Sequence, residues 1–255
     1  MVVAYGLSPY LEDCLRSLVA QTVRTPVVIS TSTPFEGMQE IADQYAAELI
    51  VHLPNRGIGH DWNQALGAAK TPLVTLAHQD DVYDPSFTEA KLAAHREFPH
   101  AAISFSRAGE MLEDGRKRHA PRNQLVKRVL VEVAFLGRRF FKGGLRKRLL
   151  LGFGNPVLCT TVTFNTKASG QFRFREDLRT NMDWTAWIEL AETGGIVRSA
   201  DSLAHRRVHA TSETAACIND GTRIAEDTLV FQSFWPRPVA ILIGMIYRLS
   251  YAGYR

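Results

Sequence analysis

The chain has 255 residues, of which 45% are hydrophobic and 22% are charged, and its formal net charge is +4. These proportions are typical of a globular protein with a substantial buried core, and they exclude a disordered, collagen-like or coiled-coil chain. The three cysteines, Cys14, Cys159 and Cys217, lie far apart and form no Cys-x-x-Cys pair, so the sequence indicates neither a disulfide framework nor a zinc site.

Neither a membrane-spanning segment nor a secretory leader is expected. The longest apolar run, Val239 to Tyr247, has nine residues, about half of the ~20 that cross a bilayer. The first residues, Met1 to Gly6, lack the basic start and the long apolar stretch of a signal peptide. From these features and the cysteine pattern we expect a cytoplasmic protein in a reducing compartment.

The first part of the chain alternates between short β-branched runs and segments with helical spacing of apolar residues. Residues 2–5 are expected to form a buried strand, and Ser8-Pro9 is expected to begin the first helix. A second helix is expected from Thr33-Pro34 and a third through Trp62 and Ala69. The other expected strands are residues 27–30, 49–53, 73–77 and 101–105. Strands that alternate with helices predict an α/β fold with a mostly parallel sheet flanked by helices.

The polar residues His78-Gln79-Asp80-Asp81 directly follow the strand at 73–77. In open α/β sheets, ligands bind beyond the carboxyl ends of the strands. Two carboxylates in that position suit a divalent cation such as Mg²⁺ or Mn²⁺. The simpler alternative is that the two acids only begin the turn before Pro85.

The positive charge is concentrated in one segment. Residues 116–148 contain twelve Lys and Arg and one acid, Glu132, whereas the rest of the chain has 18 Lys and Arg against 25 Asp and Glu. A basic surface over the whole molecule, as in many nucleic-acid-binding proteins, is therefore not expected, and no nucleic-acid partner is predicted.

At ~100° per residue, six basic residues of this segment fall on one arc, and apolar residues such as Val129, Val133 and Phe140 fall on the opposite arc. This pattern predicts a basic amphipathic helix, interrupted at Gly143-Gly144, that resembles helices lying on the inner face of an anionic plasma membrane. A helix packed on the domain with a solvated basic face is one alternative, and binding of an acidic polymer or RNA is another. The expected membrane-contact residues are Lys127, Arg128, Arg138, Arg139, Lys142 and Arg146.

The C-terminal part of the chain is expected to return to mixed structure. Residues 157–164 are rich in β-formers, and a helix is expected from Trp184 to Ala191. Short strands are expected between Ile196 and Val208, and a last helix before Trp235.

Four short motifs follow one another along the chain. The first is the run from Tyr5 to Leu11, Tyr-Gly-Leu-Ser-Pro-Tyr-Leu, and the second is Asn55-Arg56-Gly57 with Asn63 in the next helix. The third is Asp80-Asp81 at a strand end, and the fourth is Asp183-Trp184 with Arg207-Val208-His209 downstream. Together they resemble the family 2 glycosyltransferases, which implies the nucleotide-sugar-binding GT-A fold. Residues 1–110 would then be the nucleotide-sugar-binding half, 111–153 a basic amphipathic insertion, and 154–255 the acceptor-side, catalytic half of the same domain.

The resemblance implies an inverting, metal-dependent transfer of a sugar from a UDP or TDP donor to a lipid-linked or polysaccharide acceptor at the cytoplasmic membrane face. Asp183 matches the catalytic aspartate of the family, and Asp80 would orient the ribose or the donor sugar. Asp81 and His209 are the expected ligands of Mn²⁺ or Mg²⁺, and Trp184 is the expected acceptor contact. The other residues expected to bind the donor are Tyr5, Asn55, Gly57, Asp61, Asn63 and Arg207.

Several of these residues also have a purely structural interpretation. Asp183 suits a helix N-terminus, Trp184 suits a core position at helical spacing, and Arg207 and His209 suit ordinary strand positions. The second strand ends in Ser30-Thr31-Ser32-Thr33, where many family members have aspartates that hold the nucleobase. Two other functions therefore stay open: a nucleotide-sugar-binding protein without catalysis, and a basic module that binds a membrane or a nucleic acid through residues 116–148.

Overall fold

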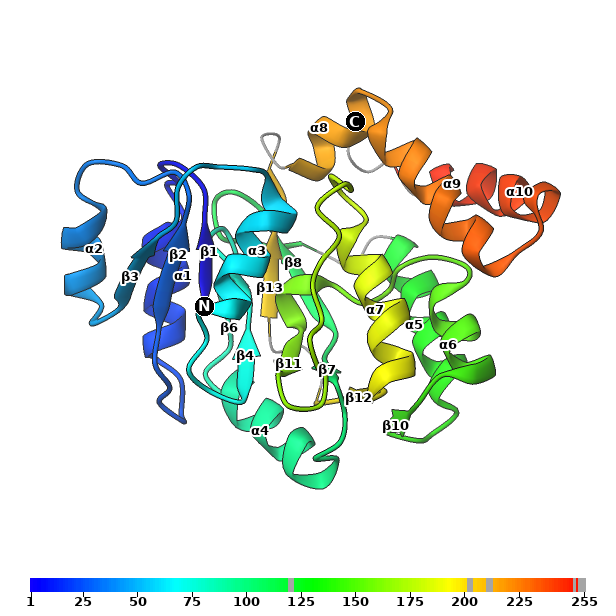
Figure 1. Ribbon diagram of the computed structural model, residues 1–255, viewed down its shortest axis with the longest axis horizontal. Coiled ribbons are helices and arrows are strands. Elements are labelled where there is room, and N and C mark those ends of the chain that lie inside the picture. The colour runs from blue at the N-terminus through cyan, green and yellow to red at the C-terminus, as the bar shows by residue number, and fades with distance from the viewer. Residues whose placement is uncertain (119–121, 201–203, 210–212, 250, 252–255) are drawn as a thin grey trace.

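In the computed structural model, which describes residues 1–118, 122–200, 204–209, 213–249 and 251, the N-terminal part forms an α/β layer (Figure 1). Its sheet has the strand order β3-β2-β1-β5, and all of these pairings are parallel. The strands are β1 (Val2–Ala4), β2 (Val28–Thr31), β3 (Glu48–Val51) and β5 (Ala77–His78). The parallel sheet predicted from the alternation of strands and helices is confirmed.

Three helices connect these strands: α1 (Leu11–Val19), α2 (Met38–Gln44) and α3 (Ile58–Gly67). In α1 the residues Leu11, Cys14 and Leu15 recur at helical spacing and are buried. They pack with Val2 and Ile29 of the central strands in one apolar cluster. Burial of this face therefore fixes α1 against the sheet. Because the strands are parallel, their carboxyl ends project from the same edge of that sheet.

Two further sheets are mixed. The second has the order β10-β12-β7-β11-β4 and the third β6-β13-β8-β9. Because β4 pairs with β11 and β8 pairs with β13, the N-terminal and C-terminal parts of the chain share sheets. The strands are β4 (Leu73–Thr75), β6 (Val82–Tyr83), β7 (Ile103–Phe105), β8 (Ala108–Met111), β9 (Lys117–Arg118), β10 (Phe140–Phe141), β11 (Thr163–Asn165), β12 (Ile196–Arg198) and β13 (Ala204–Arg207).

The remaining helices cover the mixed sheets and extend beyond them (Figure 1). Helix α7 supplies Trp184 and Trp187, both fully buried in the larger apolar cluster. Within the described ranges, no helix is both long enough and apolar enough to cross a bilayer. These helices are α4 (Phe87–Glu97), α5 (Arg122–Phe135), α6 (Gly144–Leu151), α7 (Met182–Thr193), α8 (Glu213–Asn219), α9 (Thr222–Phe234) and α10 (Arg237–Arg248), with a 3₁₀ turn at Cys159–Thr161.

Two helix starts and one strand differ from the sequence prediction. Helix α1 begins at Leu11, because the backbone carbonyl of Ser8 accepts from Leu11 N in a turn that precedes the helix. Helix α2 begins only after Gly37, whose φ of 87° directs the chain into the helix. The strand predicted at 73–77 is two strands in different sheets, since β4 pairs with β11 and β5 pairs with β1.

The single basic helix predicted within residues 116–148 is wrong. Helix α5 ends at Phe135, where Leu136 (φ 44°) and Gly137 (φ 74°) turn the chain. The next residues form β10, which pairs with β12, and α6 begins after Gly143. The chain therefore leaves the helix at Leu136 and Gly137 rather than at Gly143-Gly144, where α6 begins, and the basic residues that follow Gly137 lie outside the helix of Lys127 and Arg128.

Gly59, in the first turn of α3, allows that helix to lie against the segment around Arg175. A Cβ atom at this position would come within 2.8 Å of the Arg175 carbonyl oxygen. We expect Gly59→Ala to lower the free energy of unfolding by about 1–3 kcal/mol, because the backbone must shift to make room. The control is Gly67→Ala in the same helix, where nothing lies within 4 Å of the added atom. That control should leave stability unchanged or raise it by up to about 1 kcal/mol, and urea unfolding of both variants distinguishes the two effects.

Candidate functional site

A cavity of about 1520 Å³ opens where β1 and β5 end. Its floor contains Ala4 and His78, the last residues of the two strands, together with Tyr5 and the residues from Gln79 to Asp81 that follow them. Residues of α3, α5, α7, β13 and α10 complete its walls. The cavity therefore lies at the carboxyl edge of the parallel sheet, which is where ligands of such sheets bind.

Three side chains on this floor could hold a metal ion. One ligand atom each from His78, Asp80 and Asp81 lies within 4.8 Å of the others. Imidazole nitrogen together with carboxylate oxygens suits Mn²⁺, and carboxylates also suit Mg²⁺. His209, which the sequence predicted as a ligand, lines the same cavity and contacts Asp80, with 2.8 Å between His209 Nε2 and Asp80 Oδ2. The sequence signal that could have identified His78 as the third candidate ligand is its place at the first position of the His78-Gln79-Asp80 motif.

The two aspartates differ in their surroundings. The Asp81 side chain is buried, and burial followed by the charge of Asp80 raises its pKa to about 7. Although burial alone would raise the pKa of Asp80, the hydrogen bond and charge of His209 and the charge of His78 lower it. The same hydrogen bond raises the pKa of His209. Asp80 therefore carries the ionised and more accessible carboxylate of the pair.

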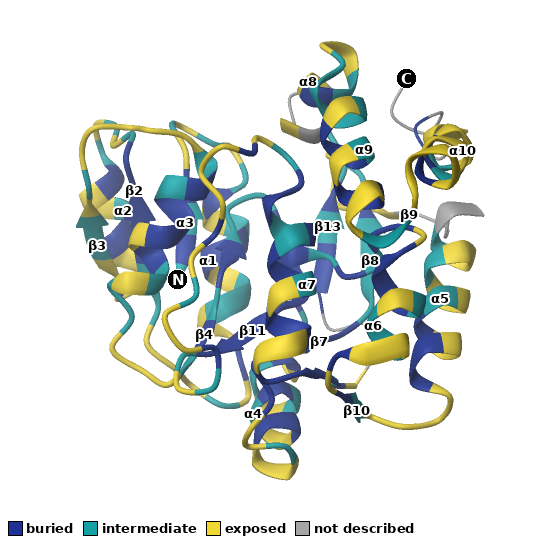
Figure 2. Ribbon diagram, turned by 45° about the vertical axis from the view of Figure 1, so that its right-hand side comes forward, coloured by how far each residue is buried: buried dark blue, intermediate teal, exposed yellow. Residues whose placement is uncertain are grey.

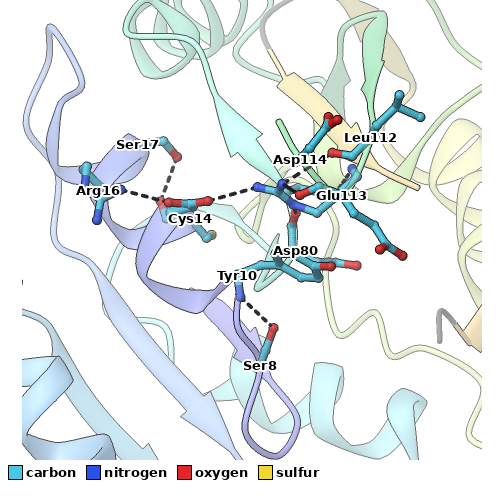
Figure 3. Close-up of polar contacts among 12 residues, drawn as sticks. Ser8, Tyr10, Cys14, Arg16, Ser17, Asp80, Leu112, Glu113 and Asp114 are labelled. Carbon is cyan, nitrogen blue, oxygen red and sulfur yellow. Dashed lines mark hydrogen bonds and ion pairs between the residues drawn. The ribbon is translucent and has the colours of Figure 1, made fainter. Parts of the chain in front are cut away.

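Arg207 has a structural role rather than the predicted role of phosphate partner. Its side chain is only 2% exposed, and Nε donates to the Asp80 carbonyl oxygen at 3.1 Å. The other nitrogens donate to the carbonyl oxygen of Glu113 and to the Asp13 carboxylate. The guanidinium also lies 4.4 Å from the centre of the Tyr10 ring. Figure 3 labels three of the residues that it contacts, Tyr10, Asp80 and Glu113. Arg207 thereby joins β13, α1 and the β8–β9 turn to the loop that presents the aspartates.

Six of the seven residues predicted to bind the donor line the cavity, and one does not. The six are Tyr5, Asn55, Gly57, Asp61, Asp80 and Arg207. Tyr5 is 65% exposed, and its backbone is bonded to the side chain of Gln79 in both directions. The prediction for Asn63 is wrong, because its amide bonds the backbone of Phe174 and the Glu176 carboxylate, away from the cavity.

Asp61, a residue of α3, places its carboxylate beside the end of β2. The residues at the end of that strand include no acid. Ser32 donates to Asp61 Oδ2 at 2.6 Å. The other oxygen, Oδ1, is buried and has no hydrogen-bond partner among the described residues, with His52 Nδ1 3.8 Å away. A buried carboxylate oxygen that is unpaired in this way can accept an N–H group from a ligand.

Asp183 lies in the first turn of α7 and faces the same cavity. Trp184 N donates to Asp183 Oδ1 at 2.6 Å, and Asn155 Nδ2 donates to Oδ2 at 3.2 Å. Burial raises the pKa of Asp183 to about 6, against the opposing charges of Arg223 and Lys127. A carboxyl group with this pKa is mostly ionised at pH 7 and can accept a proton.

The structure corrects the predicted role of Trp184. Its side chain is fully buried, its Nε1 donates to the Leu151 carbonyl oxygen at 3.0 Å, and its ring packs against Phe231 and Tyr247. It is therefore a core residue of α7, the alternative that helical spacing had left open, and it cannot contact an acceptor.

The six basic residues predicted to contact a membrane occupy different environments. Lys127 lines the cavity instead of the outer surface. Arg146 donates to the Ala134 and Phe135 carbonyl oxygens and so closes the end of α5, and Arg139 pairs with Glu97. Only Arg128, Arg138 and Lys142 of the six are exposed without such contacts in the described structure.

A sequence model described as Glycosyl transferase family 2 matches residues 1–167, and no curated protein matches the chain. Among solved structures, TarS 1-349 of S. aureus is similar at 16% identity and a TM-score of 0.60, covering 92% of this chain and 69% of that one.

Two further similar structures were determined with nucleotides and Mn²⁺. The mannosyltransferase PcManGT from Pyrobaculum calidifontis, in complex with GDP-Man and Mn²⁺, has 14% identity and a TM-score of 0.63, covering 100% of this chain and 74% of that one. Glucosyl-3-phosphoglycerate synthase from Mycobacterium tuberculosis, with Mn²⁺, UDP and glucosyl-3-phosphoglycerate, has 10% identity and a TM-score of 0.57, covering 92% and 80%. At these identities the similarity shows a shared fold.

Proposed function

The chain belongs to glycosyl transferase family 2, and from this premise we propose that it transfers a sugar, with inversion, from a nucleotide diphosphate to a hydroxyl group of a lipid-linked or polysaccharide acceptor. The observation that carries the proposal is that His78, Asp80 and Asp81 line the same cavity as Asp183. The cavity thus offers metal ligands for a diphosphate and, in addition, a carboxylate for an acceptor.

The residues divide the reaction between them. A divalent cation held by His78, Asp80 and Asp81 would neutralise the charge that develops on the departing diphosphate. Asp183 accepts the proton of the acceptor hydroxyl while the oxygen of that hydroxyl attacks the anomeric carbon of the donor sugar. Asn155 and Trp184 N fix the orientation of the Asp183 carboxylate through their hydrogen bonds. A single displacement from the face opposite the leaving group inverts the anomeric centre.

Asp61 is the residue we expect to select the nucleobase, since its free oxygen accepts an N–H group. Uracil, thymine and guanine each present a ring N–H, whereas adenine presents a ring acceptor at the equivalent edge. Similar structures hold UDP or GDP-Man, which fits this chemistry.

We expect Asp61→Asn to weaken UDP binding about tenfold to a hundredfold, the loss of a hydrogen bond to a charged group. The affinity for ADP should change little, so the ratio of the affinity for UDP to the affinity for ADP decreases. Titration of each variant with UDP and ADP in Mn²⁺ measures both affinities. Equal weakening of both nucleotides would indicate that Asp61 supports the loop rather than reads the base.

A membrane surface is the proposed setting for the acceptor. Arg128, Arg138 and Lys142 are exposed and positively charged, the first in α5 and the other two between α5 and α6. Basic residues near an anionic surface contribute about 1 kcal/mol each, so three of them give a weak attraction that salt would screen. Stronger contact requires an apolar surface in addition.

The proposal is tested by nucleotide release from a panel of donors. With UDP-, TDP- and GDP-sugars we expect release of nucleoside diphosphate that depends on Mn²⁺ or Mg²⁺ and that chelation with EDTA stops. Slow hydrolysis without an acceptor suffices for this test. Binding of a nucleotide sugar with no release from any donor, even when acceptors are added, would contradict an enzyme and favour a protein that only binds the nucleotide.

A further inference from the structure

The residues that lead into α7 are bonded by a single carboxylate of α9. Glu226 is 6% exposed and does not line the cavity. Its Oε1 accepts from Arg179 N at 2.7 Å, and its Oε2 accepts from Thr180 N at 3.0 Å and from Asn181 N at 2.7 Å. Three consecutive backbone N–H groups, those of residues 179–181, therefore share one buried side chain.

This contact takes the place of an ordinary helix cap. In the described structure the side chain of Asn181, directly before α7, makes no capping bond to the helix, and its Nδ2 instead donates to Asp227 of α9 at 2.8 Å. A carboxylate near a helix N-terminus is favourable, and hydrogen bonds to a charged acceptor are about twice as strong as neutral ones. Helix α9 therefore fixes where α7 begins.

The two helices are also joined by other side chains. Arg223 lies three residues before Glu226, on the same face of α9, and its Nη1 donates to Thr180 Oγ1 at 2.7 Å. Farther along α9, the ring of Phe231 packs edge-on against Trp184 of α7. Figure 2 shows α9 above α7, with buried and exposed residues along α9. Polar contacts before α7 and an apolar contact in its first turn thus hold the start of α7 against α9.

The position of Asp183 depends on where α7 begins, because Asp183 is the second residue of that helix. Its carboxylate accepts from Trp184 N, which belongs to the same helix, and from Asn155 Nδ2. In a reacting complex, a displacement of about 1 Å can cost about a hundredfold in rate. A shift in the start of α7 would therefore move the carboxylate of Asp183 away from the acceptor hydroxyl.

We infer that Glu226 is a positioning residue, which holds the start of α7 where Asp183 can reach the acceptor hydroxyl. The inference rests on the proposed function, because that function makes Asp183 the base. Glu226 does not line the cavity, so its effect on the reaction passes through the backbone of residues 179–181 to Asp183.

The test is Glu226→Gln, which has nearly the same shape but keeps only one oxygen to accept hydrogen bonds and turns an NH₂ group toward the N–H groups of the chain. Nucleotide release is measured with water as the acceptor, from whichever UDP-, TDP- or GDP-sugar the wild type hydrolyses fastest. We expect the rate to fall at least about tenfold. The affinity for UDP in Mn²⁺, measured by calorimetry, should stay within about twofold, because the metal ligands lie at the end of β5.

A double variant separates positioning from general damage. In Asp183→Asn the base is already absent, so the addition of Glu226→Gln should slow nucleotide release by less than about twofold. Equal losses of rate in the wild-type and Asp183→Asn backgrounds would overturn the inference. A wild-type rate in Glu226→Gln would also overturn it, as would a loss of UDP affinity that matches the loss of rate.

The matched control is Asp220→Asn, which removes a carboxylate that bonds the same Arg179, but through the side chain, with 2.6 Å between Asp220 Oδ2 and Arg179 Nη1. Its rate should stay near that of the wild type. If Glu226→Gln does not fold, Glu226→Asp replaces it: the charge is kept, but the side chain is one CH₂ group shorter and cannot reach all three N–H groups, so the same split between rate and UDP affinity is expected.

The same measurements distinguish failure of the inference from failure of the proposed function. No nucleotide release by the wild type from any donor, or a wild-type rate in Asp183→Asn, would mean that the proposed function fails and that the inference fails with it. Release that depends on Asp183 but is unchanged in Glu226→Gln would overturn the positioning role alone.

Discussion

Replacing Asp183 by asparagine is expected to slow turnover at least about a hundredfold and to leave the affinity for the nucleotide sugar near that of the wild type. The amide cannot accept the proton of the acceptor hydroxyl, but its oxygen can still accept from Trp184 N, where the carboxylate now accepts at 2.6 Å. Steady-state kinetics with calorimetric titration of the donor separates the two quantities. A suitable control is Asp177→Asn, which removes an exposed acid that pairs with Arg175 and does not line the cavity.

The pH dependence gives a second readout for Asp183. Because its pKa is raised to about 6, the base is protonated below that value, so the wild-type rate should fall as pH decreases through about 6. Folding has the opposite dependence on this group: a carboxyl pKa raised above its unfolded value of 3.8 contributes stability at low pH that is lost as pH rises toward 6. Asp183→Asn should therefore unfold at pH 7 at no lower temperature than the wild type.

Two results would reassign Asp183. If donor affinity falls together with the rate, the residue belongs to the nucleotide site. If the rate is normal, its carboxylate only satisfies the first turn of α7, the structural interpretation that the sequence also allowed.

The parts of the fold that were predicted from sequence are those in which local pattern and tertiary packing agree. The β-branched run at Val28–Thr31 is a central strand, and the spacing of Leu11, Cys14 and Leu15 gives the buried face of α1. The prediction of a single helix for the basic segment was wrong because angular spacing assumes one continuous helix. Leu136 and Gly137 have positive φ and end α5.

The site residues could be predicted where the ends of neighbouring strands bring them together. They could not be predicted where a side chain suits both a ligand-binding and a structural role. Asp80 follows β5 and Tyr5 follows β1, and these strands are neighbours, so both reach the cavity. Asn63 does not line the cavity and Arg207 does, but both side chains donate to backbone carbonyl groups that are distant in the sequence, Phe174 for Asn63 and Glu113 for Arg207. No spacing within the sequence could show those partners. Lys127 likewise required the position of α5 relative to α7 before its place beside Asp183 could be recognised.

The second large effect is expected when a metal ligand is replaced. Wild-type protein with UDP at about a hundredfold above its dissociation constant gains about 2.7 kcal/mol, which for a chain of this size raises the melting temperature by roughly 5–10 °C. We expect this rise to require Mn²⁺ and to disappear in Asp80→Asn, which removes the accessible charge of the cluster. It should also disappear in Asp81→Asn, and the fold should persist there because the amide oxygen can still accept from Arg207 N, now 2.9 Å from Asp81 Oδ1.

Differential scanning fluorimetry with UDP, in Mn²⁺ and in EDTA, measures the effect for each variant. Asp43→Asn serves as the control, since Asp43 lies on the exposed side of α2 and bonds only Gln39 by its side chain among the described contacts. A Mn²⁺-dependent rise that survives in one aspartate variant would remove that residue from the set of ligands. Survival in Asp81→Asn alone would leave Asp80 and His78 as the ligands, and the buried Asp81 would then serve to hold Arg207 and thereby the loop in place.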